Sequence, residues 1–149
     1  MKYFIYFSLT GNGDFLAEEL SKKGYQIVKV EMIKEVKKVG FFTILKYGGR
    51  AMTNKKEKIK TIELSLDKDD EVIIGSPVWN DRLSTPMNTV LSMFNFNKET
   101  TGFLLYPAGE GTKKSFKQIK KLGFNKEPII ISYPLKKKEA ALEILAKIS

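Results

Sequence analysis

The chain has 149 residues, enough for a hydrophobic core, and its 42% hydrophobic and 29% charged residues exclude disorder of the whole chain. It has no cysteine and no histidine, which excludes disulfides, thiolate nucleophiles, Cys/His zinc sites and imidazole catalysis, so difficult chemistry would need a cofactor. The formal charge of +9 favours anionic partners, although a lysine-rich surface that merely aids solubility explains it equally well.

The first thirty residues predict a strand, a helix and a second strand. Residues 2–7 are nearly continuously apolar, as expected of a central parallel strand rather than a membrane span or a signal, and we therefore expect a cytoplasmic protein. Residues 14–23 carry apolar side chains at helical spacing, and Gly24 ends this helix. Residues 25–30 predict a more polar strand nearer a sheet edge.

Residues 36–60 allow two interpretations. Their aromatic and aliphatic side chains could cover a sheet face as one helix, although Gly48 and Gly49 interrupt the pattern. The charge run at 55–60 would also suit a membrane surface or a docking partner. We favour the covering helix.

Strands and helices continue to alternate along the rest of the chain. Residues 71–75 predict a buried strand, after which Thr85 is expected to cap a helix with Pro86 in its first position. The remaining elements are strands at 102–106 and 128–133 and helices at 112–122 and 136–148.

This alternation indicates a parallel sheet with right-handed crossovers. We predict a single domain over residues 1–149. It would be a three-layer α-β-α open sheet of five parallel strands in the order 2-1-3-4-5. Ligands of such sheets bind beyond the carboxyl ends of the strands, where the strand order reverses. Three unusual segments fall at that edge.

The first of these segments follows the first strand and consists of Ser8, Leu9, Thr10, Gly11, Asn12 and Gly13. Its glycines allow a sharp turn that brings backbone N–H groups close to an anion, and the positive end of the next helix points at the same place. No Lys or Arg lies in this loop, so a phosphate would be held by dipoles and hydrogen bonds. The Gly-Lys-Ser/Thr ending of a Walker A loop is missing.

The second and third segments follow the next two strands. The second includes Ser76, Pro77, Val78, Trp79 and Asn80; the indole of Trp79 could stack on a flat ligand or anchor the loop, and Asn80 tolerates a left-handed backbone. The third includes Tyr106, Pro107, Ala108, Gly109 and Gly111, whose small side chains would let backbone groups approach a ring edge. Glu110, between them, is expected to be a surface carboxylate.

At these three segments the sequence resembles the flavodoxin family. SLTGNG is similar to the family's phosphate loop, IGSPVW to its segment after the third strand, and YPAGEG lies where its second flavin loop begins. The resemblance implies a flavodoxin-like fold that binds flavin mononucleotide (FMN) and transfers electrons. The first segment would surround the phosphate, the second would line the isoalloxazine with Trp79 on a face, and the third would flank the pyrimidine side.

Three features depart from the family pattern. Gly13 stands in place of the last hydroxyl residue of the phosphate loop, and no Tyr follows Gly111 as a second stacking aromatic, a role that Tyr106 or Phe116 could take. The chain is also basic where flavodoxins are usually acidic, so we expect an acidic redox partner protein and no specific nucleic acid. Two alternatives stay open: a small NAD(P)H-dependent FMN or quinone reductase, and a flavin-free binding module.

Overall fold

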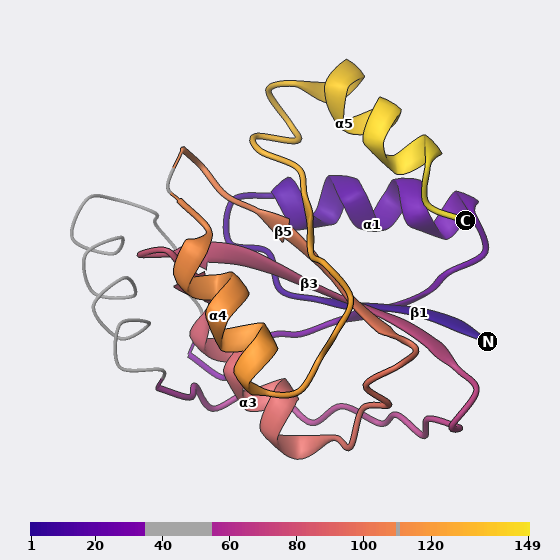
Figure 1. Ribbon diagram of the computed structural model, residues 1–149, viewed down its shortest axis with the longest axis vertical. Coiled ribbons are helices and arrows are strands. Elements are labelled where there is room, and N and C mark those ends of the chain that lie inside the picture. The colour runs from indigo at the N-terminus through magenta and orange to yellow at the C-terminus, as the bar shows by residue number, and fades with distance from the viewer. Residues whose placement is uncertain (35–54, 110) are drawn as a thin grey trace.

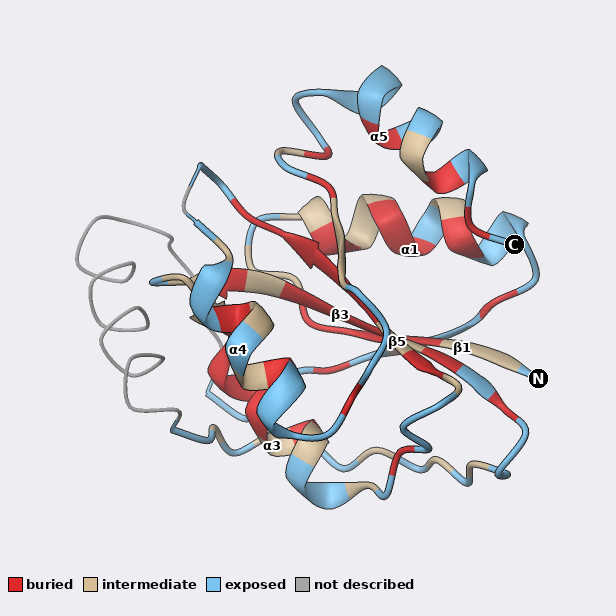
Figure 2. Cartoon of the chain, viewed as in Figure 1, coloured by how far each residue is buried: buried red, intermediate tan, exposed pale blue. Residues whose placement is uncertain are grey.

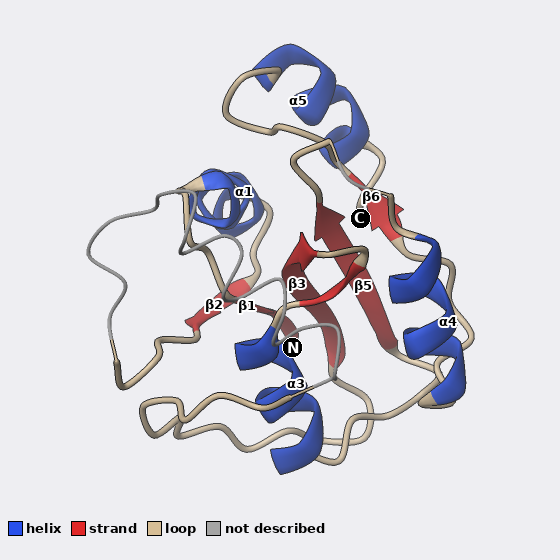
Figure 3. Ribbon diagram, turned by 90° about the vertical axis from the view of Figure 1, so that its left-hand side faces the viewer, coloured by secondary structure: helices blue, strands red, loops and turns tan. Residues whose placement is uncertain are grey.

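The computed structural model of the chain describes residues 1–34, 55–109 and 111–149. Within these residues, strands alternate with helices along the chain (Figure 1). The parallel strands lie side by side in the order β2-β1-β3-β5-β6 (Figure 3). Their bounds are β1 Lys2–Tyr6, β2 Gln26–Lys29, β3 Glu71–Trp79, β5 Thr101–Tyr106 and β6 Ile129–Ile130. The predicted order 2-1-3-4-5 is confirmed, because β5 and β6 are the predicted fourth and fifth strands.

The central strands are the most buried part of the molecule (Figure 2). β1, β3 and β5 carry the continuous apolar runs that the sequence predicts for parallel strands covered on both faces. β2 is largely exposed, which confirms its predicted place at an edge.

Helices cover both faces of this sheet (Figure 3). α1 (Asn12–Lys22) and α5 (Lys138–Ala146) lie on one face, and α3 (Thr85–Met93) and α4 (Lys113–Lys121) lie on the other. The three-layer α-β-α architecture is therefore confirmed. In the part of the chain that the structure covers, no helix is both long and apolar enough to cross a bilayer.

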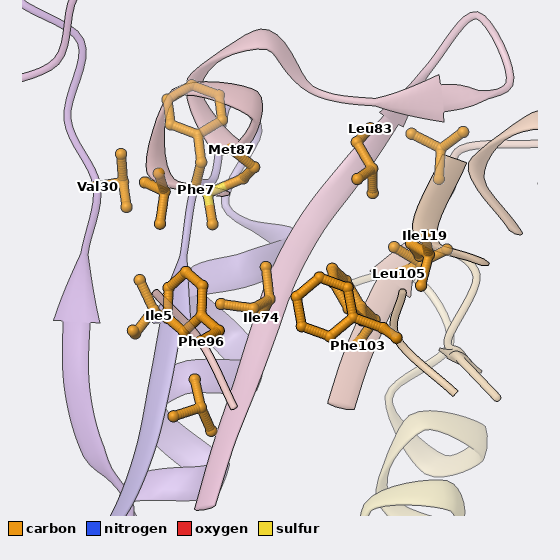
Figure 4. Packing of buried hydrophobic residues seen from close by; sticks show 14 of the residues in the cluster. Ile5, Phe7, Val30, Ile74, Leu83, Met87, Phe96, Phe103, Leu105 and Ile119 are labelled. Carbon is orange, nitrogen blue, oxygen red and sulfur yellow. The ribbon is translucent and has the colours of Figure 1, made fainter. Parts of the chain in front are cut away.

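Successive side chains of each strand point to opposite faces of the sheet, so each face has its own hydrophobic cluster. Ile5 and Phe103 belong to the cluster under α3 and α4, whereas the neighbouring Phe4 and Leu104 belong to the cluster under α1 and α5. Figure 4 shows the first cluster, in which Ile5, Ile74 and Phe103 follow one another across the sheet. This packing fixes the positions at which the strands end, and with them the loops of the site.

The last strand and the cap of α3 differ from the prediction. The last strand, predicted at 128–133, pairs with β5 as a strand at Ile129–Ile130. Beyond it the Ile131 and Tyr133 N–H groups still donate to the Leu105 and Pro107 carbonyls, and Tyr133 takes a left-handed φ of 50°. The cap of α3 is Ser84 rather than Thr85. Ser84 is held in extended conformation, with its N–H donating to Ser76 Oγ at 3.0 Å.

The predicted covering helix lies mostly outside the described residues. Its described part, residues 55–60, is not helical. Side chains of α3 satisfy this backbone instead: Thr89 Oγ1 accepts from Glu57 N–H at 2.9 Å, and Asn88 Nδ2 donates to the Lys55 carbonyl at 3.0 Å. Hydrogen bonds to side chains of α3 therefore hold this backbone, where the prediction expected hydrogen bonds within a helix.

Candidate functional site

The loop between β1 and α1 presents backbone donors at one edge of the sheet. Gly11 takes a left-handed φ of 89° at the start of α1, as the predicted sharp turn requires. The Gly13 N–H donates to Ser8 Oγ at 3.0 Å, and the Phe15 N–H donates to the Gly11 carbonyl at 3.1 Å. Within the described residues, the N–H groups of Asn12 and Asp14 have no acceptor. An anion placed beyond this first turn would meet free donors and the positive end of the helix.

Two tyrosines pack behind this loop and explain the glycine at position 13. A Cβ at Gly13 would lie 2.8 Å from Tyr106 Oη and 2.8 Å from Tyr6 Cδ2, so a larger residue does not fit. The Tyr106 hydroxyl donates to the Phe7 carbonyl, and the Tyr6 hydroxyl donates to Asp14 Oδ1 at 2.7 Å. Burial raises the pKa of both phenols well above the ordinary value, so both are neutral at physiological pH.

The segment after Gly75 is a hairpin and not the predicted loop. β3 continues to Trp79, turns at Asn80 and Asp81, and returns as the short antiparallel strand β4 (Arg82–Leu83). The sequence did not show this because Ser76 and Pro77 pair with Leu105 and Tyr106, which lie about thirty residues further along the chain. Both turn residues have positive φ, 50° and 65°, as a type I′ turn requires, and the left-handed backbone expected of Asn80 is confirmed.

Trp79 is half-buried at the end of β3, beside the first loop. Its ring meets that of Phe7 at 5.7 Å between centroids and an angle of 88°, the edge-to-face geometry that aromatic pairs favour. Arg82 is its cross-strand partner, and directly opposed side chains share one face of a hairpin. The indole is thus held in place by the residue that precedes Ser8.

The loop after β5 is tied to the other segments. Gly109 has a left-handed φ of 90° and lies against the Tyr133 hydroxyl, where a side chain would collide. Asp81 accepts two hydrogen bonds at its carbonyl from Ser115, one from the N–H at 2.7 Å and one from the hydroxyl at 2.8 Å. A Cβ at Gly111 would lie 3.4 Å from Asp81 Oδ1. Glu110 lies outside the described residues.

The structure thus brings the three predicted segments to one edge of the sheet. It uses three of the predicted side chains in the fold: Ser76 is fully buried with its Oγ 3.0 Å from Ser84 Oγ, and Val78 and Tyr106 are each 2% exposed. Gly13 and Pro107 are buried as well. The predicted residues that reach the surface, wholly or in part, are Ser8, Leu9, Thr10, Gly11, Asn12, Pro77, Trp79, Asn80, Ala108, Gly109 and Gly111.

Two residues at this edge were missed by the sequence reasoning. Asp81 Oδ1 is buried and, among the described residues, has no hydrogen-bond partner. Tyr133 is half-buried beside Gly109 and supplies an aromatic ring from the start of the connection to α5. The Asn-Asp pair is a hairpin signal that could have drawn attention to Asp81, whereas nothing in the sequence near Tyr133 marks it. Phe116, a candidate second aromatic, instead packs against the core.

A separate cavity of about 340 Å³ lies at the opposite edge, near the start of β3, and is lined in part by Asp70, Phe96 and Asn97. Both oxygens of Asp70 are already bonded, one to the amino terminus at 2.8 Å and one to the Asp67 N–H at 2.7 Å. We assign no ligand to it. The described residues also contain no group of three or more acidic side chains that could hold a metal ion.

The fold has been seen in solved flavoproteins. The chain superposes on a flavoprotein from Lactobacillus acidophilus NCFM, crystallised in complex with FMN, with a TM-score of 0.67 and 17% identity over 94% of this chain and 97% of that one. It is also similar to a protein from Bacteroides eggerthii DSM 20697, provisionally described as a flavoprotein, with a TM-score of 0.73 and 19% identity over 97% of both chains. These likenesses show a flavodoxin-like fold. No protein-family model matches the chain, and a comparison with curated proteins finds no similar sequence.

Proposed function

We propose that this chain binds FMN at the carboxyl edge of its sheet and carries electrons. The observation that carries the proposal is the meeting of two complementary features at one edge. The first turn of α1 offers N–H groups, at Asn12 and Asp14, that have no acceptor among the described residues, and Trp79 presents an indole at the end of the neighbouring strand. A ligand with a phosphate at one end and a flat ring system at the other would use both. The FMN complex of a similarly folded protein supports this choice of ligand.

Side chains around the edge fit the parts of FMN. The Ser8 and Thr10 hydroxyls, together with the free N–H groups of the α1 turn, would hold the phosphate without a charged partner in the loop itself. The buried Asp81 Oδ1, which has no donor within residues 1–34, 55–109 and 111–149, suits the N–H of the pyrimidine ring, since a buried acceptor without a donor is costly. Trp79 and Tyr133 would exclude water from the ring. When bound, FMN would supply one- and two-electron transfer.

Charge supports a protein as the redox partner. The last 39 residues contain ten lysines and three glutamates, a net +7 of the +9 carried by the whole chain. A positive field speeds association with negatively charged proteins. We therefore propose an acidic electron-transfer partner that is attracted by the positive charge of this part of the chain.

The binding proposal can be tested with the protein's own fluorophore. Trp79 is the single tryptophan, so titration with FMN should quench its emission and saturate at one flavin per chain. The visible flavin spectrum should shift in the same titration. A matched pair of variants locates the ring: Trp79→Ala should weaken FMN binding at least about fivefold, because a stacked aromatic is worth roughly 1–3 kcal/mol, and Trp79→Phe should retain most of the affinity.

Two outcomes would contradict parts of this proposal. A protein that stays colourless and keeps its tryptophan emission at high FMN concentration would exclude flavin binding and leave a flavin-free module. Rapid bleaching of the bound flavin on anaerobic mixing with NADPH would favour a reductase over a carrier, whereas inertness to NADPH would support the carrier.

A further inference from the structure

A segment far away in the sequence lies against the proposed phosphate loop. The Leu135 N–H donates to Asn12 Oδ1 at 3.2 Å, and the Leu135 side chain would lie 3.2 Å from a Cβ at Gly11. The Tyr133 N–H donates to the Pro107 carbonyl at 3.3 Å, so the same segment also contacts the third loop. It enters α5 above the end at which α1 begins (Figure 1). The charges of this segment therefore contribute to the electrostatic potential at the phosphate loop.

The segment carries three consecutive cations. Lys136 Nζ and Lys137 Nζ lie 5.6 and 5.7 Å from the centroid of the Tyr133 ring, and Lys138 Nζ lies 5.8 Å from that of Phe15, in the first turns of α1. These contacts place two of the ammonium groups over Tyr133, which lies beside Gly109 of the third loop, and the third over a ring in the first turns of α1. We call Lys136, Lys137 and Lys138 the lysine rim.

Nearby carboxylates do not neutralise the lysine rim. No ion pair within the described residues includes any of the three lysines. The acidic residue of the first turn of α1, Asp14, is already engaged by Lys29 at 2.8 Å and by the Tyr6 hydroxyl at 2.7 Å. The rim's positive charge therefore remains available to a ligand.

We propose that the lysine rim is part of the anion site and selects for the dianionic phosphate end of the ligand. The inference rests on the proposed function, because it concerns the same loop. The loop itself contains no Lys or Arg, so its hydrogen bonds would fix the phosphate in place while the rim supplies the missing charge. Since the lysines are exposed, their effect is long-range and screened by salt.

The test compares FMN with riboflavin, which has the same ring system but no phosphate. Both are titrated against three forms of the full chain: wild type, the rim variant K136Q/K137Q/K138Q, and the control variant K117Q/K120Q/K121Q. The control removes the same charge from exposed lysines of α4, on the other face of the sheet. Lys and Gln have similar helix propensity, so both variants should fold, which circular dichroism would verify.

At low salt the rim variant should bind FMN about tenfold more weakly than wild type and riboflavin less than about twofold more weakly. At about 0.5 M salt the difference in FMN affinity should nearly vanish. The control should stay within about twofold of wild type for both flavins, and K136R/K137R/K138R, which keeps the charge, should restore FMN affinity.

Three results would overturn the lysine rim while leaving flavin binding intact: an unchanged FMN affinity in the rim variant, an equal loss for FMN and riboflavin, or an equal loss in the control. Wild type that binds neither flavin would overturn the proposed function and the rim together.

Discussion

At the scale of single residues, the packing around Gly13 sets a limit on the phosphate loop. A serine at this position would restore a hydroxyl, but its Cβ would lie 2.8 Å from both Tyr106 Oη and Tyr6 Cδ2. We expect Gly13→Ser to lower the free energy of unfolding by about 1–3 kcal/mol, as overpacking typically does. Urea unfolding measures the change.

A second substitution separates crowding from other causes. Tyr106→Phe removes one of the crowding atoms, so the double variant should lose less stability than the sum of the two single losses. Gly102→Ala serves as the control, because its Cβ would meet its nearest neighbour, Lys126 Cδ, at an ordinary 3.8 Å. Strict additivity of Gly13→Ser and Tyr106→Phe would contradict the proposed crowding.

The buried phenol of Tyr106 makes stability depend on pH in the alkaline range. Burial raises its pKa well above the ordinary value of 10.0, so the unfolded chain releases the proton first. Its contribution is complete below about pH 10 and is lost as the pH rises toward the folded-state pKa, at about 1.4 kcal/mol per pH unit. Urea unfolding at about pH 9 and about pH 11 should show a steeper fall for wild type than for Tyr106→Phe; parallel falls would show that this phenol ionises freely in the folded state.

At the scale of elements, the β3–β4 hairpin positions Trp79 through its turn. Asn80 has a φ of 50°, which asparagine and glycine adopt readily and alanine does not. We expect Asn80→Ala to lower the free energy of unfolding by about 1 kcal/mol or more and Asn80→Gly to lower it only slightly. Both can be followed by urea unfolding with the emission of Trp79 as the probe. Equal losses in the two variants would mean that the Asn80 side chain, and not the backbone conformation, stabilises the turn.

The sequence predicted elements well where one periodic pattern determines them. The apolar runs of β1 and β5 and Gly24, which follows the end of α1, are local signals, and both kinds of prediction are confirmed. The hairpin was missed because Ser76-Pro77 has the composition of a turn, and pairing with Leu105 and Tyr106 overrides it. The extent of a strand depends on its neighbours, which a local pattern does not contain.

The site, like the fold, was predictable where local patterns determine it and not where it depends on contacts between residues far apart in the sequence. The three loops follow from the strand order, because parallel strands end at a common edge. The approach of Tyr133 and the lysine rim depends instead on a contact between Leu135 and Asn12, 123 residues apart. No spacing in the chain encodes that contact.

At the scale of the whole molecule, charge and site are arranged together. Residues 111–149, with their net +7, include the lysine rim, the exposed lysines of α4 and the end of the third loop. A negatively charged molecule approaching from solution is thus drawn toward the edge where we place the flavin. The same field should repel a cation of similar size, so redox kinetics can detect it without knowledge of the natural partner.

Small inorganic oxidants of opposite charge provide the measurement. With the protein reduced anaerobically in its FMN form, the rate constant for oxidation by ferricyanide should fall several-fold as ionic strength rises from about 0.01 M to about 0.5 M, because screening removes the attraction. The rate constant with hexaamminecobalt(III) should rise over the same range, because screening removes a repulsion. The two trends are independent of the intrinsic reactivity of each oxidant, since each is compared with itself. If both rates responded to salt in the same direction, the field at the flavin edge would not be positive, and an acidic partner would lose its physical basis.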